Sequence, residues 1–138
     1  MNTRVELNIK YRFDLSLNLF IERFEGRIDR DGIMEWVKKI SEEHEYKPGM
    51  NLLTDMSDCQ LEIDFQGMHD FCTELLNQPN LKVNRLAVIA PEPLQFGISR
   101  MYQMLVEESD IHREMRIFSS LSEACEWLGL PGDFDLGL

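Results

Sequence analysis

Two aspartates near the middle of the chain have the spacing of a small carboxylate site. Asp55 lies at the end of a short predicted strand over residues 51–56, and Asp58 follows three residues later. Open α/β sheets bind ligands beyond the carboxyl ends of their strands, so paired acids there would hold a cation or move a proton. The alternative is structural, because aspartates in such loops also accept hydrogen bonds from the backbone of the loop and of the next helix.

The histidines and cysteines do not form a catalytic or metal-binding pattern. No HxH, HExxH, CxxC, GxSxG, P-loop or GxGxxG motif is present. Cys72 and Cys125 fall on apolar helical stripes, whereas Cys59 is expected in a loop beside Asp58, where nearby acids raise the pKa of the thiol. We therefore expect no enzymatic activity, no metal, no cofactor and only surface histidines, at His44, His69 and His112.

Methionines in two predicted helices are the first candidates for a binding pocket. A helix over residues 94–105 has a core stripe that includes Met101, and Met104 lies one position outside this stripe and widens the apolar face. Met68 lies beside Phe71 on the preceding helix. Because methionine side chains adapt their shape, these residues would line a deformable pocket for an acyl chain or a similar ligand. The alternative is ordinary packing of helices on a sheet.

Arg100 lies on the polar side of the same helix. Its guanidinium would meet the carboxylate or phosphate head group of an amphipathic ligand. The alternative partners are Glu107 and Glu108.

Hydrophobic periodicity predicts the elements that position these residues. Strict alternation over residues 5–13, and again over 17–25, predicts two antiparallel strands. A helix then runs from about Ile33 to His44. The remaining predicted elements are strands at residues 51–56, 86–90 and 116–118, and helices at about 65–76, 94–105 and 121–128.

This order of elements predicts an α/β fold. Strands separated by helices form parallel pairs through crossover connections, so we expect one five-stranded, mostly parallel sheet with an antiparallel N-terminal strand. At 138 residues the chain is long enough for one domain, over residues 1–131. Residues 132–138 follow a helix stop at Gly129 and Pro131, so we expect a flexible tail or contacts with a neighbouring copy, as in a homodimer.

Charge and hydropathy limit the partners. The formal net charge is −11, and residues 41–70 carry eight acids against Lys47 alone. Binding to nucleic acid or to an anionic membrane needs clustered Lys and Arg, so neither is expected. The longest apolar run, Leu86–Ala90, is too short for a transmembrane segment, and the N-terminus does not resemble a signal peptide. These features, with an odd number of cysteines, predict a cytoplasmic protein.

Several short motifs, in order, resemble the SpoIIAA-like family, which belongs with the STAS domains of anti-sigma-factor antagonists and the SEC14-type lipid-binding domains. They are YKPG at 46–49, LLTD at 52–55, AP at 90–91, FGISRM at 96–101, IF at 117–118 and EACEWL at 123–128. The resemblance spans about Val5 to Pro131. It implies a five-stranded sheet with helices largely on one face, a bacterial cytoplasmic protein and no established enzymatic reaction.

The resemblance also bears on regulation. STAS regulators are switched by phosphorylation of a serine that follows an aspartate at the start of the second helix. The corresponding positions here are Asp64 and Phe65, and a phenyl ring has no hydroxyl that can be phosphorylated. Ser57 is the nearest remaining acceptor.

We therefore expect binding of a small apolar or lipid-like molecule between the second and third helices and the sheet. The resemblance to lipid-binding domains and the apolar residue at position 65 both favour it. The expected site residues are Phe65, Met68, Phe71, Phe96, Arg100, Met101 and Met104. The alternative is a protein–protein regulatory module of the anti-sigma-factor antagonist type that lacks the phosphoserine.

Overall fold

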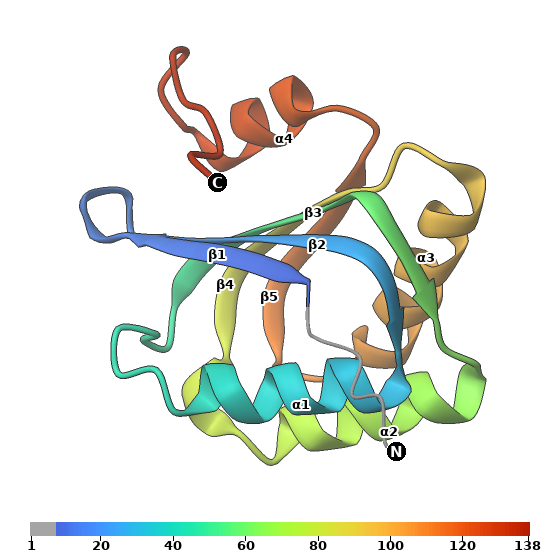
Figure 1. Cartoon of the computed structure of the whole chain (residues 1–138). Helices are drawn as coiled ribbons and strands as arrows, with labels where there is room; N and C mark the ends of the chain where they lie inside the picture. The colour runs from blue at the N-terminus through green and yellow to red at the C-terminus, as the bar shows by residue number, and fades with distance from the viewer. Residues whose placement is uncertain (1–7) are drawn as a thin grey trace.

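A five-stranded sheet forms the centre of the molecule in the computed structural model, which describes residues 8–138 (Figure 1). Its strands are β1 (Ile9–Asp14), β2 (Leu19–Asp29), β3 (Met50–Glu62), β4 (Val83–Ile89) and β5 (His112–Phe118). They lie side by side in the order of the chain, with β1 antiparallel to β2 and every other neighbour parallel. The expected fold class is confirmed. Val5 and Leu7, expected in the first strand, lie outside the described residues.

The helices cover the two faces of the sheet unequally. Helices α1 (Arg30–Ser41), α2 (Phe65–Leu76) and α3 (Pro93–Val106) lie on one face, and α4 (Leu121–Leu128) lies on the other (Figure 1). Two short 3-10 turns, at Leu15–Leu17 and Pro79–Leu81, complete the elements of the described chain. The expectation of helices largely on one face is therefore confirmed.

Side-chain caps fix where three of the helices begin. Asp29 accepts a hydrogen bond from the backbone of Gly32, and Asp64 accepts one from Gly67, both at 2.8 Å. Ser120 does the same for α4. A capping oxygen satisfies one of the backbone N–H groups that a helix start leaves without a partner. Phe65 is the first residue of α2, directly after the cap Asp64.

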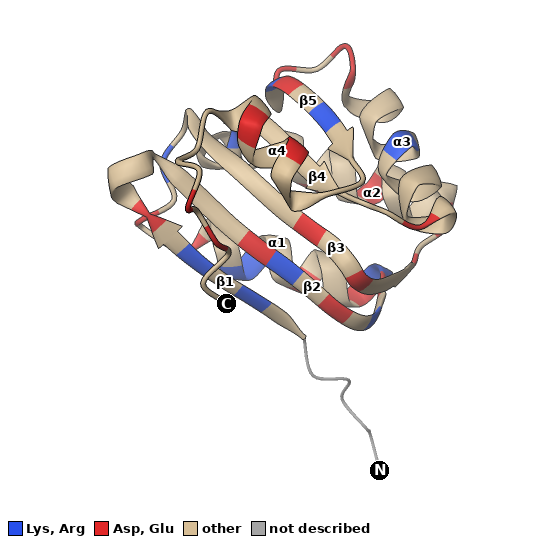
Figure 2. Ribbon diagram, turned by 90° about the horizontal axis from the view of Figure 1, so that it is seen from above, with Lys and Arg blue, Asp and Glu red and all other residues tan. Residues whose placement is uncertain are grey.

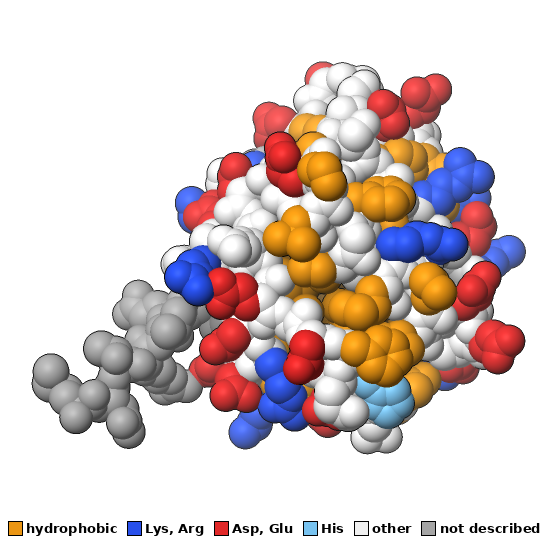
Figure 3. Space-filling model, turned by 90° about the vertical axis from the view of Figure 1, so that its right-hand side faces the viewer, with side chains coloured by type: hydrophobic (Ala, Val, Ile, Leu, Met, Phe, Trp, Pro, Cys, Tyr) orange, Lys and Arg blue, Asp and Glu red, His pale blue; other side chains and the backbone are white. Residues whose placement is uncertain are grey.

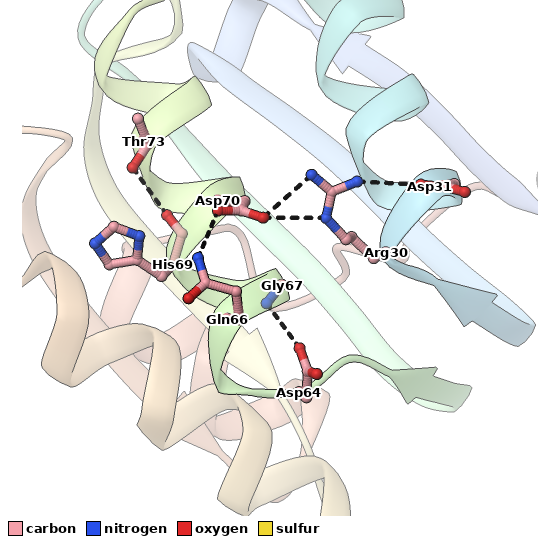
Figure 4. Close-up of polar contacts among 8 residues, drawn as sticks. All are labelled: Arg30, Asp31, Asp64, Gln66, Gly67, His69, Asp70 and Thr73. Atoms are coloured by element: carbon pink, nitrogen blue, oxygen red, sulfur yellow. Dashed lines mark hydrogen bonds and ion pairs between the residues drawn. The ribbon is translucent and has the colours of Figure 1, made fainter.

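A polar contact joins α1 to α2. Arg30, at the start of α1, donates two hydrogen bonds from Nε and Nη2 to one carboxylate oxygen of Asp70 on α2, at 3.2 and 3.1 Å (Figure 4). Gln66 donates to the other oxygen of Asp70 at 2.9 Å. The first turn of α2 is also closely packed, because a Cβ added at Gly67 would lie 2.8 Å from Cγ1 of Ile63. These contacts hold α2 beside α1 over the sheet.

Strand β2 is buried on both faces. Phe20 and Phe24 belong to the large apolar core under α1, α2 and α3, whereas Leu19 and Ile21 belong to a smaller core under α4. The alternation over residues 17–25 identified the face toward α4. It did not reveal that the opposite face of the same strand is also buried.

Strand β3 is longer than its sequence predicts. It extends to Glu62 because β2 pairs with it as far as Asp29, with Glu25 opposite Asp58 and Gly26 opposite Cys59. A register shift between Arg23 and Glu25 accommodates an extra residue of β3, and such bulges bend a strand. The expected loop around Ser57, Asp58 and Cys59 is therefore wrong, as is the expected end of the strand at Asp55.

The C-terminal residues contact the same chain. Leu136 is buried in the core under α4, and Arg12 of β1 donates to the carbonyl oxygens of Leu136 and Asp135 at 2.6 and 3.0 Å. Figure 2 shows this segment lying back toward β1. Gly137 has a positive φ of 66°, and a Cβ there would meet the guanidinium of Arg12 at 2.6 Å. The tail thus has a partner within its own chain, which its sequence did not predict.

Candidate functional site

An apolar cavity of about 110 Å³ lies between the sheet and helices α1, α2 and α3. Aromatic and aliphatic side chains from every layer line it, among them Phe24 of β2, Trp36 of α1 and Phe71 of α2. The polar groups among its lining residues include the side chains of Glu22, Thr54, Ser99 and His112 and the hydroxyls of Tyr46 and Tyr102. An apolar cavity with a few polar groups is the usual form of a site for a small molecule.

The cavity approaches the surface on the side of α2, α3 and β5. All of its lining residues on α1, β2, β3 and β4 are buried. The partly exposed ones come from the loop before α2, from α2, from α3 and from β5: Ile63, Phe71, Leu75, Ile98, His112 and Met115. Figure 3 shows the right-hand side of the molecule, where apolar side chains gather at the surface.

Glu22 is a buried acid in the wall of this cavity. It is 6% exposed and points to the helix side of β2, between Phe20 and Phe24. Its two oxygens accept hydrogen bonds from Trp36 Nε1 at 2.8 Å and from the hydroxyl of Thr54 at 3.0 Å. Burial raises the pKa of Glu22 to about 7, although these two hydrogen bonds act in the opposite direction. Near neutral pH the cavity therefore holds a carboxyl group that is partly protonated.

His112 is the second ionisable group of the cavity. Its Nε2 lies within hydrogen-bond distance of the hydroxyl of Tyr102 on α3. Its Nδ1 is buried and has no hydrogen-bond partner among residues 8–138. Burial lowers the pKa of the ring to about 3, so His112 is neutral at physiological pH. The expectation of a surface histidine is wrong at this position, because β5 begins here and turns the ring into the core.

Two of the expected site residues line the cavity. Met68 is 2% exposed, and Phe71 is partly buried beside Tyr102, with ring centroids 5.7 Å apart. Met101 is partly buried and packs against the same core without lining the cavity. Of the seven expected site residues, two therefore line the cavity and a third lies in the core beside it.

The other expected site residues lie at the surface. Phe65, Phe96 and Met104 are 61%, 48% and 62% exposed. Arg100 is also exposed and donates to the side chain of Gln103 at 2.6 Å rather than to Glu107 or Glu108. The residues on α3 point outward because its inward face carries Gln95, Ser99, Tyr102 and Val106, and Phe65 is the first residue of α2, whose buried residues are Gly67, Met68 and Cys72.

Phe96 lines a second, shallow hollow beyond the ends of β4 and β5. Pro91, Pro93, Phe118 and Glu123 lie around it. This hollow lies closer to the carboxyl ends of the parallel strands than the cavity does, and open α/β sheets usually bind ligands at those ends. No buried polar side chain lines it, which makes the cavity under the helices the better defined site.

Asp55 and Asp58 do not face the cavity. Asp55 is buried on the α4 side of β3, where Arg23 Nε lies 3.2 Å from its Oδ2 and the backbone and hydroxyl of Ser57 donate to its Oδ1. Asp58 is exposed. Arg23 already neutralises the buried carboxylate, which favours the structural role over a cation site. Over residues 8–138, no group of three or more His, Cys, Asp or Glu side chains is arranged to hold a metal ion.

The buried cysteines are poor nucleophiles. Cys59 lies in β3 and Cys72 in α2, and burial raises the pKa of each thiol to about 11. Only the thiolate attacks an electrophile, so these side chains act as small apolar residues. Burial, rather than the nearby acid, is the cause at Cys59.

Sequence reasoning missed Glu22 and His112. A signal for Glu22 is present, because in the alternation of β2 it shares a face with Phe20 and Phe24. An acid between two core phenylalanines is unusual, since buried acids need hydrogen-bond partners. His112 has polar neighbours at Arg113 and Glu114, so nothing in its local sequence indicates burial.

Comparisons with known proteins identify the fold. No family model and no curated protein matches the sequence. Among solved structures, the chain is similar to an uncharacterized protein of the DUF3478 family with a SpoIIAA-like fold from Shewanella loihica PV-4. The TM-score is 0.59 at 15% sequence identity, and the match covers 93% of this chain and 98% of that chain. The chain therefore has a SpoIIAA-like fold, as its motifs predicted. No helix within residues 8–138 is long and apolar enough to cross a membrane.

Proposed function

We propose that the protein is a non-enzymatic, cytoplasmic binding protein for a small, mainly apolar molecule, held in the cavity between the sheet and helices α1, α2 and α3. The observation that carries the proposal is a cavity of about 110 Å³ in the core, with a buried acid and a half-buried imidazole in its wall. Protein interiors contain few voids larger than a water molecule.

The size of the cavity indicates a small ligand. An engineered apolar cavity of about 150 Å³ binds benzene, so the present one suits a molecule of about that size. A longer chain would have to extend from the cavity toward the surface beside Phe71 and Ile98. Hiding ~200 Å² of apolar surface contributes roughly 5 kcal/mol, and the costs of association then leave a Kd on the order of 1 mM or weaker for benzene itself.

A filled-cavity variant tests the proposal. Ser99 is buried in the cavity wall, and its hydroxyl donates to the sulfur of Met56 at 3.5 Å. Ser99→Leu would fill the cavity, whereas Ser99→Ala would remove the hydroxyl and keep the space. We expect benzene to bind the wild type and Ser99→Ala, but not Ser99→Leu, in a titration followed by NMR. Equal binding to all three proteins, or no binding to the wild type, would contradict the proposal.

The natural ligand is a separate question from the capacity to bind. Native mass spectrometry of protein purified from its host, followed by solvent extraction, would detect a retained molecule. We expect an added mass that Ser99→Leu, purified in the same way, lacks. A mass retained equally by both proteins would place the ligand outside the cavity.

The exposed apolar side chains favour a second candidate, a protein–protein regulatory module. Phe65, Phe96 and Met104 lie at the surface with Leu94, which is 66% exposed. Single exposed apolar residues are common, but several together on neighbouring helices favour a contact surface. This function predicts one stoichiometric partner in a pull-down from the host, lost in the double variant Phe96→Ser/Met104→Ser and kept in Ser99→Leu.

A further inference from the structure

The buried carboxyl group of Glu22 is held by two uncharged donors. Its oxygens accept hydrogen bonds from Trp36 Nε1 at 2.8 Å and from the hydroxyl of Thr54 at 3.0 Å. Within residues 8–138 it forms no ion pair. An ionised carboxylate accepts up to about four hydrogen bonds, so these two donors leave part of its capacity open.

This carboxyl group belongs to the wall of the cavity. Glu22, Trp36 and Thr54 all line the cavity, so the residues that hold the carboxyl group on α1 and β3 enclose the same space. Burial, and after it nearby negative charge that includes Glu22, raises the pKa of the phenols of Tyr46 and Tyr102, two further lining residues. The charge of Glu22 is therefore sensitive to what fills the cavity, whether or not the carboxyl group contacts it.

Two other ionisable side chains lie beside Glu22 on β1 and α1. Tyr11 is the register partner of Glu22 on β1, and its hydroxyl donates to Glu43 at 2.7 Å, which raises the pKa of the phenol. Lys39 is the cation recorded against the rings of Tyr11 and Trp36, at 5.5 and 6.0 Å from their centres, and it is exposed. Neither group places a charge within hydrogen-bond distance of Glu22.

The ionisable groups around the cavity keep one charge state near neutral pH. Burial raises the pKa of the phenols and of the thiol and lowers that of the imidazole, and the groups concerned are Tyr46, Tyr102, Cys72 and His112. Burial also raises the pKa of Glu22, to about 7. Among these described groups, Glu22 is therefore the one whose charge changes near neutral pH.

Filling the cavity changes the cost of ionising Glu22. A cavity of about 110 Å³ has room for water, which solvates a carboxylate. An apolar ligand excludes this water and donates no hydrogen bond in its place, so it penalises the ionised form more than the neutral form. Coupling between two sites is reciprocal, so a bound proton must favour the ligand as much as the ligand favours the proton.

On the basis of the proposed function, we infer that the cavity takes up its apolar ligand together with a proton on Glu22. The site binds more tightly in mildly acidic than in alkaline solution, and it releases the ligand as the carboxyl group ionises. A ligand that donates a hydrogen bond to Glu22, or that carries a positive charge, favours the ionised form and has the opposite pH dependence.

A titration with benzene at two pH values tests this coupling. If the bound ligand raises the pKa of Glu22 by about 1, the wild type should bind benzene about fivefold more weakly at pH 8 than at pH 6. Glu22→Gln keeps the shape of the side chain and every other ionisable group, so its Kd should agree within about 1.5-fold at the two pH values. An unchanged Kd of the wild type, a tighter Kd at pH 8, or a dependence that Glu22→Gln retains would overturn the inference.

The proton can also be followed in the wild type without a variant. The ¹³C chemical shift of the side-chain carboxyl carbon reports the ionisation of Glu22 in an NMR titration. We expect benzene to raise the pKa obtained in this way by about 1. An unchanged or lowered pKa in the presence of bound benzene would overturn the inference even if Glu22→Gln failed to fold.

The outcomes also separate the inference from the proposed function. Failure of the wild type to bind benzene at either pH, or binding that Ser99→Leu retains, would overturn both. Binding that Ser99→Leu abolishes, with the same wild-type Kd at pH 6 and pH 8, would overturn only the coupling to Glu22.

Discussion

Replacement of Glu22 by glutamine should remove a pH-dependent cost from the core. Glutamine keeps the shape of the side chain, and its oxygen still accepts from Trp36 or Thr54. Burial raises the pKa of Glu22 from 4.5 to about 7, so the folded state binds this proton more tightly than the unfolded state. Folding is therefore penalised where Glu22 must ionise. The penalty is absent below about pH 4.5, grows as the pH rises to about 7 and is complete above it.

The size of this effect follows from the pKa. A rise from 4.5 to about 7 corresponds to about 3 kcal/mol in the free energy of unfolding. Glu22→Gln should therefore gain up to about 3 kcal/mol over the wild type at pH 8, relative to the difference between the two proteins at pH 4.5. Urea denaturation at several pH values, followed by tryptophan fluorescence, measures this difference.

A second variant, Thr54→Val, also tests whether Glu22 titrates in the core. Thr54→Val removes a donor that stabilises the ionised carboxylate, so it should move the pH dependence to higher pH. A difference between Glu22→Gln and the wild type that stays constant from pH 4.5 to 8 would show that Glu22 does not titrate in the core.

Three further substitutions have defined outcomes. Ser99→Leu should raise the free energy of unfolding by roughly 1–2 kcal/mol through cavity filling, and a loss of stability in urea denaturation would show that the space is not available. Gly67→Ala should cost about 1 kcal/mol, because its Cβ would meet Cγ1 of Ile63 at 2.8 Å; an unchanged urea midpoint would contradict this close contact. Asp55→Asn should cost about 1–2 kcal/mol by weakening the contact with Arg23, yet leave benzene affinity unchanged. Weaker benzene binding by Asp55→Asn would contradict the placement of the site on the helix side of the sheet.

The sequence predicted the class of fold and the order of its elements because those depend on local periodicity. The alternation in β1 and the helical stripes of α1 to α4 are strong patterns. The length of β3 depends on its pairing with β2, which extends past polar residues such as Ser57 and Asp58. Local polarity therefore ended the predicted strand too early.

The candidate site was predicted less well than the fold. Met68 and Phe71 reach the cavity, since they lie on the apolar side of α2. Phe65 and Met104 are apolar residues on the outer sides of their helices, and residue type alone does not distinguish those from core positions. The polar groups of the cavity come from β2, β3, α3 and β5, so their convergence is a property of the tertiary structure.

The most direct test of a ligand site under the helices uses the methionine methyl groups as reporters. Met68 is 2% exposed and lines the cavity, whereas Met104 is 62% exposed on the outer side of α3. With ¹³C-methyl methionine and added benzene, nuclear Overhauser effects show which methyl groups the ligand contacts. A ligand in the cavity predicts effects from benzene to the methyl group of Met68 and none to that of Met104. Effects to Met104 without any to Met68 would place the ligand on the surface and contradict the proposed site.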